Sequence, residues 1–176
     1  MNKILTVTFI FIFIFVFINP MQAQQLDVEL LLGSQSGDQG YGANFLLRPT
    51  DSFSGAFNYY YQENNYRNIN FLVNYHLPDY FIGDYYTYLI LGISQIEYEY
   101  PAEKYTGFMA GFNFERQVSE NFLAHTDLRV GVYPDKLAGF YNLGFTYLFN
   151  NNFGVKLSYQ GFNRNNGPVA GVRFKF

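Results

Sequence analysis

The sequence contains no cysteine and no tryptophan, and only 14% of its 176 residues are charged. Without cysteine the chain can form neither a disulfide framework nor a thiolate metal site. An average soluble domain has about 25% charged residues, so the usual supply of surface Lys and Glu is also missing. The formal net charge is -3, which gives no electrostatic reason to expect nucleic acid as a partner.

Long apolar runs are scarce as well, because only one occurs and it stands near the beginning. Lys3 precedes an almost wholly apolar stretch over 4–18, Pro20 follows its end, and the small residue Ala23 comes next. A short basic region, an apolar region and a small residue at the cut are typical of a secretory signal peptide. We expect residues 1–23 to be this peptide and the mature chain to start at Gln24. An uncleaved membrane anchor is the alternative, although such a run is short for a span.

Aromatic residues are abundant, with 21 Phe and 17 Tyr. The mean hydropathy is nevertheless close to neutral, at -0.08. Transmembrane helices each need about 20 consecutive apolar residues, which this chain does not supply repeatedly. Strands of a membrane β-barrel alternate apolar residues that face lipid with polar or small residues that face the lumen, so their hydropathy averages out. The composition therefore favours a barrel.

Ten stretches show period-two alternation and are separated by turn residues. The clearest is 66–77, where Ile69 and Phe71 alternate with Asn68 and Asn70. The pattern predicts an all-β fold, a single antiparallel up-and-down transmembrane β-barrel over 24–176, with ten strands or alternatively eight. The phase of the fifth stretch is ambiguous. The predicted strands are 26–33, 41–48, 53–62, 66–77, 85–98, 105–118, 122–133, 140–149, 153–162 and 168–176.

The connections between these strands fall into two alternating classes. Segments such as 119–120 and 150–152 are short, whereas 34–40, 134–139 and 163–167 are longer. Outer-membrane barrels have short periplasmic turns and longer external loops. An even strand count also places both termini at one end of the barrel, so the pattern predicts periplasmic termini.

Aromatic residues gather at both ends of the predicted strands. Phe53, Phe122 and Phe153 each follow a polar turn, and the opposite strand ends are rich in tyrosine. Aromatic side chains at the two membrane interfaces are typical of outer-membrane barrels. We therefore expect two aromatic girdles, the second formed by Tyr59, Tyr60, Tyr61, Tyr66, Tyr98, Tyr100 and Tyr105.

The last predicted strand alternates Val172, Phe174 and Phe176 with Gly171, Arg173 and Lys175. With the signal peptide and the alternating strands, the chain resembles the small bacterial outer-membrane barrels of the OmpA-barrel and OmpX type over residues 25–176. This resemblance implies an outer-membrane location and contact with outer-membrane lipid and lipopolysaccharide. It also implies that the barrel-insertion machinery reads Val172, Phe174 and Phe176. The family includes adhesins, anchors, narrow pores and a few enzymes, so it does not fix a function.

Four predicted inward charges stand on the first and last strands: Asp27 and Glu29 on one, Arg173 and Lys175 on the other. These two strands must pair to close the barrel. Buried charges persist only when they are paired. We therefore predict a closing salt-bridge cluster, with an ion-selectivity ring as the alternative.

A second interior network is expected from Glu115, His125, Asp127 and Arg129. His125 with Asp127 is the one combination that suggests an enzyme, but no serine motif stands beside it. The other histidine, His76, is on a separate predicted strand, which makes a poor metal site. We predict a structural role for this network, with no catalytic residue, no cofactor and no metal.

The sequence therefore predicts a non-enzymatic outer-membrane barrel with a structural, interaction or narrow passive-pore role and little or no conductance. One alternative is a barrel enzyme that acts on envelope lipid or peptide. Another is a barrel subunit of a secretion or conjugation machine, with an unknown envelope partner. The rival fold is a soluble, lipocalin-like β-barrel, which would bury the aromatic face instead of exposing it to lipid.

Overall fold

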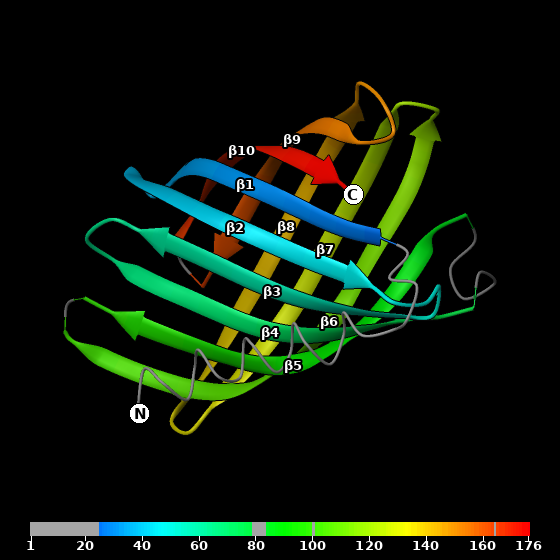
Figure 1. The fold of residues 1–176 in the computed structure, drawn as a ribbon. Helices are drawn as coiled ribbons and strands as arrows, with labels where there is room; N and C mark the ends of the chain where they lie inside the picture. Colours follow the sequence, from blue (N-terminus) through cyan, green and yellow to red (C-terminus); the bar gives the residue numbers. More distant parts are fainter. Residues whose placement is uncertain (1–24, 79–83, 100, 164) are drawn as a thin grey trace.

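The computed structural model describes residues 25–78, 84–99, 101–163 and 165–176, which form ten antiparallel strands (Figure 1). Each strand pairs with its sequence neighbours and β1 also pairs with β10, so the sheet closes into a barrel. The predicted all-β, ten-strand up-and-down barrel is confirmed, and the alternative prediction of eight strands is wrong. The predicted signal peptide lies outside the described residues. The strands are β1 (Gln25–Gln35), β2 (Asp38–Arg48), β3 (Phe53–Gln62), β4 (Tyr66–His76), β5 (Tyr86–Tyr98), β6 (Glu103–Ser119), β7 (Phe122–Tyr133), β8 (Lys136–Leu148), β9 (Phe153–Phe162) and β10 (Asn165–Lys175).

The β1–β10 pair closes the barrel. Asp27 stands opposite Lys175 and Glu29 opposite Arg173 in its register. The start of β1 and the end of β10 therefore lie at one end of the barrel, as Figure 1 shows. We name this the terminal end and the opposite one the distal end. None of the described residues forms a helix long and apolar enough to cross a membrane.

Large apolar side chains on all ten strands point away from the lumen. Phe108 is 74% exposed and Leu137 69% exposed. In a soluble domain contiguous apolar surface of this kind is rare, because water contact with it is unfavourable. The structure also shows which residues of β5 face the lumen, a point that the sequence pattern left ambiguous. Leu91 and Ile93 face outward, whereas Ile90 is buried inside.

The distal connections are tighter than the sequence suggests. β1 runs to Gln35 and β2 begins at Asp38, so the turn between them is Ser36 and Gly37. Both turn residues have positive φ, at 53° and 94°, the conformation that a two-residue hairpin turn requires. Because the flanking polar residues pair as strand, the prediction that the distal connections are longer than the terminal turns is wrong. The long connection between β4 and β5 lies instead at the terminal end, so loop length does not orient the barrel.

Aromatic side chains do gather on the outside near the terminal end. The rings of Phe53 and Tyr75 are 4.9 Å apart, and Phe153 lies between Phe149 and Phe174 at 5.5 and 5.4 Å. Such pairs of aromatic rings stabilise each other beyond the area they bury. This end of the barrel thus has the outward aromatic cluster that the Phe repeat predicts.

Candidate functional site in the barrel lumen

The terminal half of the lumen is held together by ion pairs centred on Asp27. Arg173 of β10 donates to the Asp27 carboxylate at 2.6 Å, and Arg48 of β2 lies 3.9 Å from it. Gln25 adds a hydrogen bond of 2.8 Å. Asp27 is almost fully buried, so its charge depends on these partners.

Glu29 has an ion-pair partner from outside the predicted closing cluster. It pairs with Lys156 of β9 at 3.0 Å, two strands away from β1. Lys175, which was predicted to belong to the closing cluster, is exposed and lines a cavity at the terminal mouth. Lys156 therefore supplies the cation for Glu29, because its long side chain reaches the carboxylate from inside, across Gly171 of β10.

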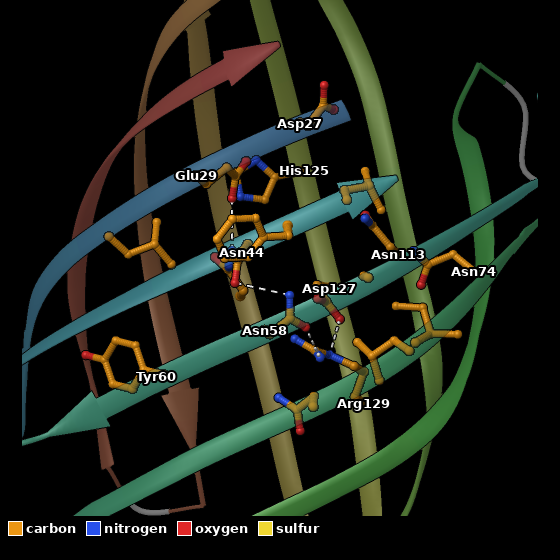
Figure 2. Close-up of a pocket in the computed structure, with 18 of the residues that line it drawn as sticks. Asp27, Glu29, Asn44, Asn58, Tyr60, Asn74, Asn113, His125, Asp127 and Arg129 are labelled. Atoms are coloured by element: carbon orange, nitrogen blue, oxygen red, sulfur yellow. Dashed lines mark hydrogen bonds and ion pairs between the residues drawn. The ribbon is translucent and has the colours of Figure 1, made fainter. Parts of the chain in front are cut away.

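From Glu29 a chain of polar contacts crosses the lumen (Figure 2). Asn44 donates to Glu29 at 3.0 Å, and Asn58 donates to Asn44 at 3.1 Å. Arg129 then donates to Asn58 at 3.3 Å and to Asp127 at 2.9 Å.

Arg129 forms a brace between opposite walls, because Asn58 is on β3 and Arg129 on β7, with three strands between them. Arg129 is only 6% exposed, and its guanidinium stacks on Phe140 at 3.8 Å. A planar guanidinium has a flat face and several N–H donors, so it can stack on a ring and donate to two partners at once. We refer to this contact chain as the cross-brace.

The space around the cross-brace is small. The cavity there has a volume of about 140 Å³, and wider cavities of about 350 and 240 Å³ lie at the terminal mouth. The amide oxygens of Asn68, Asn70 and Asn142 face the inner cavity and have no donor among the described residues. A polar cavity of this size accommodates several water molecules, which can satisfy such groups.

The distal half of the lumen is filled by aromatic and aliphatic side chains. The rings of Tyr66 on β4 and Phe162 on β9 meet across the barrel, 5.0 Å apart, and each is only 1% exposed. The buried members of this group, which we name the plug, are Tyr60, Tyr66, Ile96, Tyr133, Ala138 and Phe162, with Tyr98, Tyr105 and Phe140 packed against them.

Two of the three buried tyrosine hydroxyls in the plug are paired, and the Tyr60 hydroxyl has no partner among the described residues. Tyr66 donates to the Gln35 side chain at 2.9 Å, Gln62 donates to the Gln35 carbonyl at 2.6 Å, and Tyr133 donates to Ser94 at 2.8 Å. These bonds fix the rings in position, because a buried hydroxyl without a partner is costly. The plug therefore fills the distal half of the lumen with side chains that are almost wholly buried.

The plug corrects the predicted distal girdle. Tyr60 and Tyr66 lie inside the barrel, and Tyr98 and Tyr105 pack on them. Tyr59 and Tyr61 do face outward, in contact with Tyr41 at 6.5 and 5.2 Å. Tyr100 lies outside the described residues. Each strand alternates its faces, so neighbouring tyrosines cannot share one girdle.

The remaining predicted residues divide between the lumen and the outer face. Glu115 accepts from Asn113 at 3.3 Å and stands opposite His125 in the β6–β7 register. Both line the inner cavity. Val172, Phe174 and Phe176 stand at alternate positions at the end of the chain, and Phe176 is exposed. Their role in insertion stays a prediction. No group of three or more His, Asp or Glu in the described residues could hold a metal ion.

Sequence reasoning missed Arg48, Asn44, Asn58 and Lys156. All four stood in the right phase of their strands, but nothing in a one-dimensional pattern shows which inward residues meet across a lumen. Their position depends on the stagger between strands, which is set by closure of the whole barrel.

Comparison of the sequence with protein-family models and with curated proteins finds no match. Solved structures do match by fold. The NanC porin superposes with a TM-score of 0.54 at 10% identity, over 85% of this chain and 100% of that one. The KdgM porin gives 0.51 at 11% identity, over 85% and 99%. The chain thus shares its β-barrel fold with these two porins, and the matches do not single out the OmpA or OmpX subgroup.

Proposed function

We propose that this protein is an integral outer-membrane β-barrel with a sealed lumen and a structural or interaction role. The observation that supports membrane insertion is the distribution of side chains: apolar residues are exposed on all ten strands, while the charged residues Asp27, Arg129 and Lys156 are buried inside. This is the reverse of a soluble protein and suits a barrel surrounded by lipid. The same distribution argues against a lipocalin-like fold, whose apolar residues would face inward.

The sealed lumen is supported by the plug and the cross-brace, which obstruct the lumen at two different heights. A passing ion would have to displace Tyr66 and Phe162 and then the buried Arg129. Dry apolar constrictions oppose ion passage because an ion loses its hydration there. In this proposal Asp127 serves to hold Arg129, and His125 and Glu115 fill the wall beside it.

The membrane claim is tested by fractionating cells that express the full chain, followed by gel migration of boiled and unboiled samples. We expect the protein in the outer-membrane fraction, with faster migration when unboiled. A soluble protein without a heat-dependent shift would refute the proposal, and the exposed apolar belt would then need another explanation.

A narrow pore is the second candidate, and the cavities of about 350 and 240 Å³ at the terminal mouth favour it. They give water access to the cationic side chains Arg48, Arg173 and Lys175. The fold shared with the NanC and KdgM porins is compatible with a pore. Conductance distinguishes the two candidates, because a pore must pass ions through the distal half and the sealed barrel does not.

A further inference from the structure

The two cavities at the terminal mouth adjoin each other, and we name them together the mouth site. Their volumes are about 350 and 240 Å³, and Gln25, Arg48, Tyr86 and Tyr88 line both of them. Cavities that bind small molecules usually have volumes of about 300–1,000 Å³. The mouth site lies at the opposite end of the lumen from the plug. Its size therefore suits a small organic molecule that enters from the terminal end.

Arg48 carries hydrogen-bond donors that no described residue uses. Its guanidinium lies 3.9 Å from the Asp27 carboxylate, which is beyond hydrogen-bonding distance. Asp27 already accepts from Arg173 at 2.6 Å and from Gln25 at 2.8 Å. The buried Nε atom of Arg48 also has no partner among the described residues. Because a guanidinium has five N–H donors, Arg48 can donate to an added acceptor without giving up a hydrogen bond.

Lys175 is the second cation of the mouth site with unused donors. Its side chain is exposed, lines the larger cavity and pairs with no described side chain. Lys175 stands opposite Asp27 in the β1–β10 register, and Arg48 stands opposite Gln25 in the β1–β2 register. Strands that flank a common neighbour are about 10 Å apart, a distance that the long Arg and Lys side chains can span from both sides. The two cations can therefore reach one bound group between them.

The carboxylates around the mouth site do not occupy these donors. Glu115 lines the larger cavity and Asp51 lines the smaller one. Within the described part of the chain, neither forms an ion pair with Arg48 or Lys175, and nor does the chain-end carboxylate of Phe176. The donors of both cations thus stay available to an added oxyanion, whose binding Glu115 opposes by its like charge.

Aromatic rings form one wall of the mouth site. Tyr86 is 47% exposed, and with Tyr88 it lines both cavities. The ring of His76 lies 5.9 Å from that of Tyr86 and 5.1 Å from that of Tyr88. Packed rings hold one another in place, and an exposed ring face can stack on the ring of a ligand. The mouth site therefore combines two cations that have unused donors with a flat aromatic wall.

From this arrangement we propose that the mouth site binds a small organic oxyanion, a carboxylate or phosphate group carried on a flat ring. Arg48 donates to the oxyanion through its planar fork and Lys175 through its ammonium, while the ring of the ligand packs against Tyr86. Such charge-assisted hydrogen bonds are stronger than neutral ones. The site lies inside the barrel, so the inference goes beyond the proposed function and does not depend on which side of a membrane the terminal end faces.

The test measures binding of benzoate and of phenyl phosphate to the full protein, purified in detergent, by titration calorimetry. We expect saturable binding of at least one of them, and the tighter of the two identifies the preferred oxyanion. Benzamide carries the same ring without the charge, so it should bind at least about tenfold more weakly than the preferred anion.

Variants of the mouth site test the assignment of its residues. Arg48→Gln and Lys175→Gln should each weaken binding of the preferred anion about fivefold or more, because a charge-assisted hydrogen bond is lost. Glu115→Gln should tighten it about threefold, since a competing negative charge is removed. Arg116→Gln is the matched control: this exposed arginine pairs with Asp84 at the terminal end, at 3.6 Å, and its loss should leave the affinity unchanged. Circular dichroism checks that each variant is folded.

Several results would overturn the inference. They are no saturable binding of either anion, equal binding of benzamide, an unchanged affinity in folded Arg48→Gln or Lys175→Gln, or an equal loss in Arg116→Gln. Because binding is measured on the purified protein, any of these refutes the mouth site alone and leaves the outer-membrane proposal standing. A soluble protein that binds the anion as expected would refute the outer-membrane proposal alone.

Discussion

The two halves of the lumen are filled by opposite chemistry within one barrel. In the terminal half, Asp27 and Glu29 are paired with Arg48, Arg173 and Lys156 beside cavities wide enough for water. In the distal half, aromatic rings meet across the barrel with almost no exposure. The comparison teaches that strand number alone does not decide whether a barrel is open. Whether the barrel is open depends on which side chains its closure brings together at each height.

The largest expected effect of a single substitution is on the cross-brace. Arg129→Ala should lower the free energy of unfolding by about 3–5 kcal/mol, because it leaves the buried Asp127 without its cation. The measurement is urea unfolding in detergent, followed by the gel shift of the folded form. The control Arg116→Ala removes an exposed arginine and should cost about 1 kcal/mol or less. Equal losses in both variants would show that the contacts of Arg129 contribute no more to stability than those of an exposed arginine.

A comparable loss is expected in the plug. Phe162→Ala should cost about 3–5 kcal/mol, because the neighbouring rings cannot collapse fully into the space. Phe108→Ala removes the same side chain from the outward face, where lipid replaces it without a lasting cavity. That loss should be smaller, about 1.5–3 kcal/mol. The same unfolding assay compares the two, and a larger effect at Phe108 would contradict a tightly packed plug.

The contrast between the polar terminal half of the lumen and the apolar outer face can be tested separately. Leu143 faces outward in the middle of β8 and is 47% exposed. Leu143→Arg should destabilise the barrel by about 2–4 kcal/mol in a lipid bilayer. In a protein whose outer face meets water, the same substitution should be nearly neutral, within about 0.5 kcal/mol. Unfolding measured in lipid vesicles separates these outcomes.

The smallest expected effect concerns the rim of the plug. The Lys136 ammonium lies 3.5 Å from the centre of the Tyr105 ring and 4.2 Å from that of Tyr98. Lys136→Met keeps the apolar stem and removes the charge, so it should cost about 0.5–1 kcal/mol, the range of an exposed cation–π contact. A loss as large as that of Phe162→Ala would mean that this lysine is part of the plug itself.

The fold could be predicted from sequence because its signal is local. Period-two alternation marks each strand and its two faces, and this was enough for the strand count and for the inward phase of Asp27, Asp127 and Arg129. Tyr66 shows what was overlooked. It shares a phase with the inward residues Asn68 and Asn70, so its burial was available from the alternation.

The contacts between distant strands could not be predicted in the same way. The Lys156–Glu29 pair joins β9 to β1, and the Arg129–Asn58 contact joins β7 to β3. Both depend on the stagger and diameter of the closed barrel, which alternation within one strand does not encode. The turn lengths were not predicted correctly, because the Gly, Ser and Gln residues around Ser36 can either pair as strand or form a loop.

The central claim is that the lumen is sealed, and single-channel recording in planar lipid bilayers tests it most directly. The sample is the full protein, shown to be folded by its heat-dependent gel shift before it is added. The account predicts bilayers that carry no unitary current steps, because the plug and the cross-brace obstruct the lumen at two heights. Reproducible unitary steps from this folded, wild-type protein would contradict the seal and establish the narrow pore.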